Sequence, residues 1–205
     1  GKYDIRVSFL SSENGKNLAL RILRPEILSM EKLGMHESLL SQTKELVLSQ
    51  KGLFLLTGAT GSGKTTTAYA LLSFLNKDTR KIMTAEDPVE FIVEGICQSN
   101  ICEKKGNTFG SLLRAFLRQD PDIIFIGEIR DKETAEMALS ASLMGHLVIS
   151  TMHADSLEKI KLRFQEWGLH KNIIESGLIG ALSQKAKVDN GKFIRSFYLE
   201  TQVSK

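Results

Sequence analysis

A glycine-rich octapeptide behind a short apolar run constrains this chain more than any other feature. The apolar run covers residues 53–57, and Gly-Ala-Thr-Gly-Ser-Gly-Lys-Thr covers residues 58–65. The spacing G-x-x-x-x-G-K-[ST] between a buried strand and a helix is typical of a phosphate-binding loop, because its glycines let several backbone N–H groups face one anion. The positive end of the following helix adds to that attraction. The segment therefore predicts a nucleoside triphosphate site.

Each residue of this loop has an expected task. The Lys64 ammonium should reach the β- and γ-phosphates, and the Thr65 hydroxyl should ligate Mg²⁺. A glycine-rich surface turn, the alternative interpretation, leaves the lysine and the threonines at the helix start without a reason. The residues expected to bind the nucleotide are Gly58, Ala59, Thr60, Gly61, Ser62, Gly63, Lys64, Thr65 and Thr66.

The pattern beyond residue 50 predicts an α/β fold with a mostly parallel sheet. Continuous apolar runs, typical of strands buried on both faces, alternate with amphipathic segments. The expected strands are 53–57, 81–85, 123–127 and 147–151, and the expected helices are 65–75, 109–119, 132–144, 156–166 and 171–186. One further strand is expected after the turn at Asn190 and Gly191, and no internal repeat is found.

The first residues differ from the rest of the chain. Apolar and polar residues alternate over 4–9 and again over 18–22, with Asn14 and Gly15 between them, which predicts a β-hairpin. Residues 26–50 have the pattern of a helix. We expect one unit at 1–27 and a main domain at 28–205. Because the chain begins with Gly1, a fragment or a processed chain is also expected.

Two acidic segments follow apolar runs. Glu128 ends the run 123–127, and Glu86, Asp87 and Glu90 follow the run 81–85. The carboxyl ends of parallel strands gather ligands, so these acids should lie near the phosphates. Carboxylates there would repel a nucleotide unless a metal compensates, which makes Mg²⁺ an expected cofactor, with Glu128 in its shell. The alternatives are a structural acid and an exposed acidic turn.

Composition narrows the class of protein only slightly. The 205 residues carry a net charge of +3, which is too small to demand a nucleic-acid-binding face. Cys97 and Cys102 have neither the number nor the spacing of a zinc site. No apolar run approaches the roughly 20 residues that cross a bilayer, so any membrane role should be peripheral.

Four blocks of this sequence resemble, in the same order, the ATPases of type II secretion and type IV pilus assembly. The blocks are GLFLLTGATGSGKTTTAYALL, AEDPVEF, the run from LRAFLRQDP to IGEIRD, and the run from KETAEMALS to STMHADS. The resemblance covers about residues 4–182. It implies a RecA-like phosphate-loop domain that hydrolyses ATP with Mg²⁺, assembles as a hexameric ring, and drives pilus or pseudopilus assembly. The implied location is cytoplasmic, peripheral on the membrane, with a platform protein as partner and pilin-like subunits as indirect partners.

The resemblance also assigns catalytic residues. It implies that Glu86 or Glu128 positions and activates water, and sequence does not divide that task between them. His146 and His153 match a histidine box, and as a pair flanking one strand they are expected to sense the γ-phosphate; a structural histidine is the alternative. Arg6 and Arg21 match arginines that reach across to nucleotide, the alternative being a solvent-facing row.

The sequence also departs from the family pattern. Most of the family's N-terminal domain and the tetracysteine zinc block are absent, and the end of the chain matches more loosely. A short, zinc-free chain is similar to the competence branch, which builds a pseudopilus for DNA uptake. An ATP-binding assembly or localisation module with little hydrolysis is the second hypothesis. A RecA-like enzyme acting on DNA is the third, and direct nucleic acid binding is not expected because no basic, aromatic-interleaved loop is present.

Overall fold

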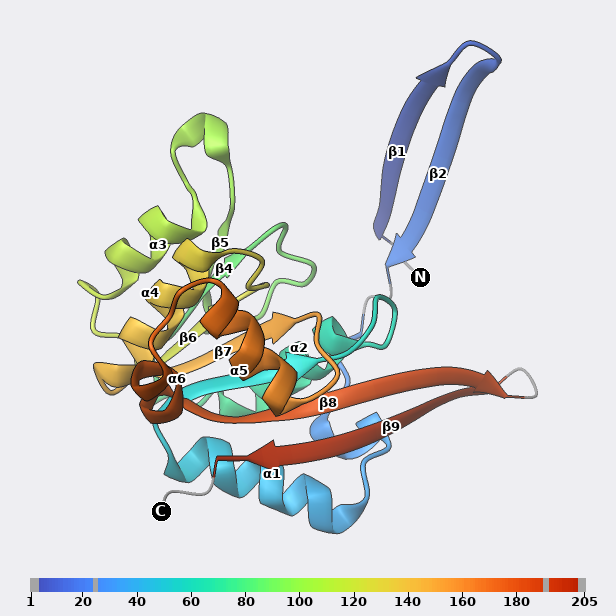
Figure 1. Cartoon of the computed structure of the whole chain (residues 1–205). Helices are drawn as coiled ribbons and strands as arrows, with labels where there is room; N and C mark the ends of the chain where they lie inside the picture. The colour runs from blue at the N-terminus through green and yellow to red at the C-terminus, as the bar shows by residue number, and fades with distance from the viewer. Residues whose placement is uncertain (1–3, 24–25, 190–191, 203–205) are drawn as a thin grey trace.

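The computed structural model describes residues 4–23, 26–189 and 192–202. Within these ranges, the backbone alone is described at eight residues: Asp4, Arg6, Arg21, Ile22, Leu23, Val188, Lys192 and Phe193. The described residues form a seven-stranded sheet covered by helices and a separate two-stranded sheet, which projects from the main body in Figure 1.

The large sheet has the order β5-β4-β6-β7-β3-β8-β9. Its strands are β3 (Gly52–Thr57), β4 (Ile82–Glu86), β5 (Cys97–Asn100), β6 (Ile123–Ile126), β7 (Leu147–Met152), β8 (Leu178–Asp189) and β9 (Lys192–Thr201). All neighbours pair in parallel except β8 and β9, which are antiparallel. The predicted α/β fold with a mostly parallel sheet is confirmed.

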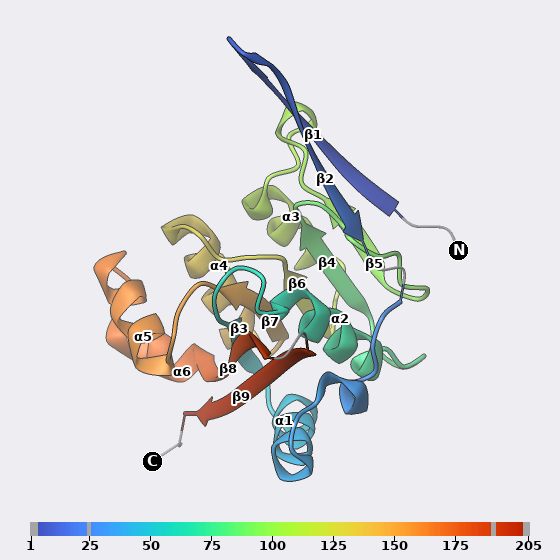
Figure 2. The ribbon, with the colours of Figure 1, turned by 90° about the vertical axis from the view of Figure 1, so that its right-hand side faces the viewer.

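Helices cover both faces of this sheet and bury two core layers (Figure 2). On one face pack α3 (Phe109–Phe116), α4 (Lys132–Leu143), α5 (Leu157–Glu166) and α6 (Lys171–Gly177). On the other pack the 3₁₀ turn η1 (Met30–Leu33), α1 (Glu37–Ser49) and α2 (Lys64–Leu75). Alternate residues of β3 enter the two layers, Leu53 and Leu55 in one and Phe54 and Leu56 in the other, so the strand is apolar throughout.

The predicted hairpin is confirmed as β1 (Asp4–Ser12) and β2 (Gly15–Leu23). The strands pair in antiparallel register, with Val7 opposite Leu20 and Phe9 opposite Leu18. Gly15 has a φ of +122°, a value that glycine adopts without strain. Nothing in the fold tests the expected division of the chain at residue 27, which stays a prediction.

Two predicted helices are wrong, and one strand was not predicted. The helix expected over 171–186 ends at Gly177, because the apolar residues that follow it extend the sheet beside β3. A short apolar run has no period that separates helix from strand. The helix expected over 26–50 is interrupted at Gly34, whose φ is +85°. The edge strand β5 was not predicted, since Cys97–Asn100 is polar and only partly buried.

Candidate nucleotide-binding site

The glycine-rich loop connects β3 to α2 and has the backbone that its sequence predicts. The strand ends at Thr57, and the helix begins at Lys64. Between them, φ is +140° at Gly58, +77° at Gly61 and +93° at Gly63. A side chain would strain the backbone at each of these positions. The predicted strand–loop–helix unit is therefore confirmed, and Gly63, in the left-handed conformation, directly precedes α2.

A buried glutamine from β8 forms hydrogen bonds with this loop and with α2. Gln184 is 1% exposed, donates from Nε2 to the carbonyl of Ser62, and accepts from the Thr67 hydroxyl at 2.9 Å. Its own carbonyl lies so near Gly58 that a Cβ there would be 2.1 Å away. Sequence reasoning missed Gln184 because it assigned the residue to a helix. The long buried strand β8 thus fixes the loop and the first turn of α2 together.

Lys64 lies inside the loop. Its ammonium donates to the carbonyls of Gly58 at 2.7 Å and Ala59 at 3.1 Å, and the side chain is nearly buried. Burial lowers the pKa of Lys64 from its ordinary value, and the charge of Glu128 acts in the opposite direction. Nearby, the Ser62 hydroxyl is buried, with no hydrogen-bond partner among the described residues. A cation and an unsatisfied hydroxyl in a glycine loop fit a bound polyphosphate.

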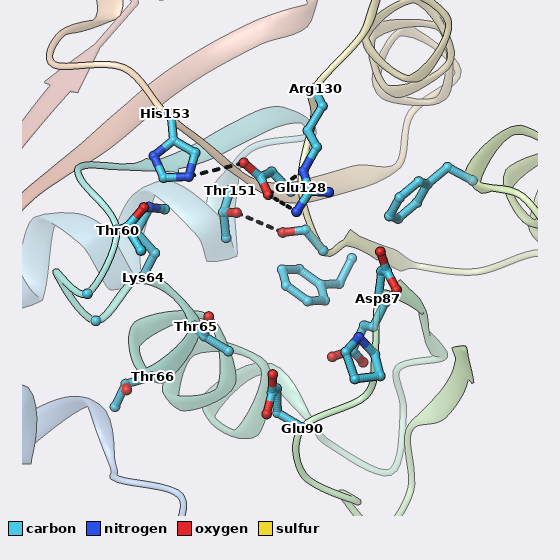
Figure 3. Close-up of a pocket in the computed structure, with 17 residues that line it drawn as sticks. Thr60, Lys64, Thr65, Thr66, Asp87, Glu90, Glu128, Arg130, Thr151 and His153 are labelled. Atoms are coloured by element: carbon cyan, nitrogen blue, oxygen red, sulfur yellow. Dashed lines mark hydrogen bonds and ion pairs between the residues drawn. The ribbon is translucent and has the colours of Figure 1, made fainter. Parts of the chain in front are cut away.

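A cavity of about 620 Å³ opens beside the loop, at the carboxyl ends of β4, β6 and β7 (Figure 3). Ligands gather at this edge of parallel sheets. Of the residues predicted from sequence, those that line it are Thr60, Gly61, Gly63, Lys64, Thr65, Thr66, Glu86, Asp87, Glu90, Glu128 and His153. The remaining lining residues are Pro88, Phe109, Phe125, Gly127, Arg130 and Thr151.

Glu128 is held by two nitrogen-bearing side chains. Arg130 donates from Nε to one carboxylate oxygen at 2.7 Å, and its Nη2 lies 2.7 Å from the same oxygen in an ion pair. The other oxygen lies 3.3 Å from Nε2 of His153. Thr151, which sequence reasoning did not single out, donates to the carbonyl of Gly127 at 2.8 Å and so joins β7 to the end of β6. Figure 3 shows these contacts at one wall of the cavity.

Glu86 is in a different setting. Its carboxylate is 3% exposed and accepts hydrogen bonds from the Tyr69 hydroxyl at 2.5 Å, the Thr84 hydroxyl at 2.6 Å and Nε2 of Gln98 at 3.2 Å. These donors come from three different elements, α2, β4 and β5. Glu86 lines part of the cavity, but its carboxylate oxygens accept hydrogen bonds from side chains of the protein interior. The half-buried Glu90, four residues on, lines the same cavity from the segment after β4.

The expectation for His146 is wrong. This residue precedes β7, so it lies at the amino edge of the sheet, opposite the phosphate-binding loop, where Nδ1 contacts the carbonyl of Pro121 at 2.8 Å. His153 follows β7 and lies in the cavity. Two histidines at the two ends of one strand cannot share one edge. Arg6 and Arg21 face each other across the hairpin backbone, and their side chains lie outside the described residues.

The donor set fits Mg²⁺ only in part. Thr65 and Glu128 line one cavity, as a phosphate-bound magnesium requires. Across the part of the chain that the structure describes, no three His, Cys, Asp or Glu side chains form a ready metal cluster. Magnesium is commonly held by one or two protein oxygens together with substrate phosphates and water. The residues present therefore fit magnesium that arrives with a nucleotide.

No helix in residues 4–23, 26–189 and 192–202 is both long enough and apolar enough to cross a membrane.

Comparison with known proteins gives consistent matches. The family model described as "Type II/IV secretion system protein" matches residues 1–190. The type II secretion system protein E of Pseudomonas aeruginosa is 47% identical over 184 residues, which are 89% of this chain and 37% of that protein. The type II secretion system ATPase E of Vibrio cholerae is 42% identical with the same coverage. This chain thus spans little more than a third of these relatives.

Solved structures match the fold as well. The pilus retraction motor PilT with bound ADP superposes with a TM-score of 0.85 and 31% identity, over 98% of this chain and 60% of that one. The ATPase DotB of Legionella pneumophila superposes with a TM-score of 0.81 over 97% of this chain and 58% of its own; at 24% identity it supports the fold alone.

Proposed function

This chain belongs to the family of type II/IV secretion system proteins, and we propose that it hydrolyses ATP with Mg²⁺ as the motor domain of a secretion or pilus machine. The observation that carries the proposal is the convergence of Lys64, Thr65, Glu128 and His153 on one cavity beside a glycine loop. These residues come from the start of α2 and from the segments that follow β6 and β7, and together they supply a cation, a hydroxyl, a carboxylate and an imidazole.

The binding step follows from the loop and its helix. Backbone N–H groups of the loop and the positive end of α2 attract the phosphates, and Lys64 exchanges the loop carbonyls for phosphate oxygens. Bound Mg²⁺, held by Thr65 and Glu128 together with phosphate oxygens, would neutralise negative charge on the transferred phosphoryl group. His153, already beside Glu128, can donate a hydrogen bond to the γ-phosphate and lose that partner after hydrolysis.

Water activation is proposed for the cavity acids Glu90 and Glu128. The Glu86 carboxylate accepts three internal hydrogen bonds, so we assign it no direct contact with water. An acid that lines the cavity can orient the attacking water and accept its proton while phosphoryl transfer proceeds. Figure 3 shows Glu90 and Glu128 at different walls of this cavity, so a nucleotide between them would be flanked by carboxylates.

The test is to measure ATP binding and phosphate release separately in the full-length protein. Lys64→Ala should lose nucleotide binding and turnover, whereas Glu128→Gln should keep binding, because Lys64 and the loop are intact, and lose turnover by about 100-fold or more, because it removes the carboxylate proposed to act on Mg²⁺ and water. Lys51→Ala and Glu158→Gln are matched controls on exposed positions. Turnover at the wild-type rate in both site variants would refute the assignment.

We also propose the wider setting that the family resemblance implies. The motor acts as a hexamer on the cytoplasmic face of the membrane, bound to a platform protein, and extends or withdraws a polymer of pilin-like subunits. The relatives at 42 to 47% identity are type II secretion proteins, which favours a secretion pseudopilus over the competence pseudopilus. Light scattering with and without a non-hydrolysable ATP analogue tests the hexamer. A monomer under both conditions, together with absent turnover, would favour the ATP-binding assembly module instead.

A further inference from the structure

Behind the cavity wall, a cluster of polar side chains joins α2 to the segment that carries Glu90. Tyr69 projects from α2, is 1% exposed, and donates to Glu86 at 2.5 Å. The same hydroxyl accepts from the backbone N–H groups of Glu90 at 3.0 Å and Phe91 at 3.3 Å. A tyrosine hydroxyl has one proton to donate and two lone pairs. All of that capacity is used here, so the hydroxyl has one favoured orientation.

Two further features hold this hydroxyl in place. The Tyr69 ring packs edge-on against Phe91, with centroids 5.1 Å apart and an interplanar angle of 81°. Burial and the adjacent Glu86 raise the pKa of Tyr69 well above its ordinary value, which keeps the proton on the hydroxyl. The phenol therefore remains a donor to Glu86 while it accepts from the backbone.

Gln98 holds the other side of the same segment. Its Nε2 donates to Glu86 at 3.2 Å and to the carbonyl of Phe91 at 2.9 Å, and its Oε1 accepts from the backbone of Val93 at 2.7 Å. Glu86 therefore orients two side chains, Tyr69 and Gln98, and both bind the backbone that follows β4. Buried polar networks that are fully satisfied fix a single arrangement.

We propose that Tyr69 is a positioning residue: through its hydroxyl, oriented by the buried Glu86 carboxylate, it fixes the backbone of Glu90 so that this acid faces the nucleotide cavity. This inference rests on the proposed ATPase function and deepens it. Since Tyr69 lies on α2, the helix that begins with Lys64, its hydrogen bonds couple the phosphate-binding loop directly to the segment that carries Glu90. Glu86 then contributes to hydrolysis by orienting these groups, and Glu90 by acting in the cavity.

The test is the substitution Tyr69→Phe in the full-length protein, with Tyr198→Phe on the exposed side of β9 as the matched control. Tyr69→Phe keeps the ring contact and removes only the hydroxyl. We expect kcat for ATP hydrolysis to fall about 10- to 100-fold, because small misplacements of catalytic groups have effects of this size. KM and the affinity for ATP should stay within about twofold of wild type, since Lys64 and its loop are untouched. Tyr198→Phe should behave as wild type.

A double variant separates positioning from general damage to the fold. If Tyr69 acts through Glu90, adding Tyr69→Phe to Glu90→Gln should not slow the enzyme further. Equal fold-losses in both backgrounds would overturn the inference, as would wild-type kcat in Tyr69→Phe. If circular dichroism shows that Tyr69→Phe fails to fold, Gln98→Leu serves instead, and a wild-type kcat in that variant would overturn the inference. Absence of turnover in the unaltered protein would refute the ATPase proposal itself, a distinct outcome.

Discussion

Replacing Gln184 by leucine should weaken the fold at the point where β8 supports the phosphate-binding loop. Leucine has nearly the same size, but it cannot donate to the Ser62 carbonyl or accept from the Thr67 hydroxyl. Both groups lie in the interior, with Thr67 fully buried and Ser62 3% exposed. The substitution therefore leaves one buried acceptor and one buried donor without their partner.

The expected loss follows from these two groups. A buried polar group that loses its partner costs about 1–3 kcal/mol, so Gln184→Leu should lower the free energy of unfolding by about 2–4 kcal/mol after the gain from an apolar side chain. With a typical urea dependence, this lowers the denaturation midpoint by about 1 M or more. Adding Thr67→Val removes the orphaned hydroxyl, so the double variant should recover about 1 kcal/mol relative to additivity.

Urea denaturation followed by circular dichroism measures these differences, and nucleotide titration follows the loop. We expect weaker ATP binding in Gln184→Leu, because the Ser62 carbonyl is freed to move. Gln165→Leu, on the exposed side of α5, is the control and should change stability by less than about 0.5 kcal/mol. A loss below that same level in Gln184→Leu, or strict additivity with Thr67→Val, would contradict the argument.

Three further predictions concern the cavity. Gly58→Ala should abolish nucleotide binding because its Cβ would lie 2.1 Å from the Gln184 carbonyl, whereas Gly61→Ala, with no atom within 4 Å, should weaken binding less; titration compares them. Burial lowers the pKa of Lys64 in the folded protein, so the charge of Lys64 destabilises the fold at pH values below this lowered pKa and has no such effect above the ordinary pKa of lysine. Bound nucleotide should raise the pKa of Lys64 again, and ¹⁵N NMR of the ammonium should detect the resulting proton uptake. His153→Ala should slow hydrolysis at least about tenfold, while His146→Ala should leave the rate within about twofold.

The parts of this protein that sequence could predict are those set by short-range chemistry. The strand, loop and helix around Lys64 follow from an apolar run and three glycines whose φ values are positive. The position of Glu128 just after β6 likewise follows from an apolar run that stops at a carboxylate. The prediction of a helix over 171–186 was wrong because apolar residues such as Leu178 and Leu182 suit a buried helix and a buried strand equally well. They form a strand because the edge of β3 is available for pairing, which the local sequence does not reveal.

The roles of the acids required contacts between distant segments. Glu86 and Glu90 belong to one acidic run, and sequence gave no reason to prefer Glu90. The difference comes from Tyr69, 17 residues before Glu86, and Gln98, 12 residues after it, which surround one carboxylate with donors. These donors hold the Glu86 carboxylate in the interior, whereas Glu90 is half-buried in the lining of the nucleotide cavity. Residues of the same type, four positions apart, are therefore distinguished by the side chains that the fold brings to them. We expect Glu86→Gln to lower both stability and kcat, because it disturbs the buried contacts that position Glu90, and Glu90→Gln to lower chiefly kcat.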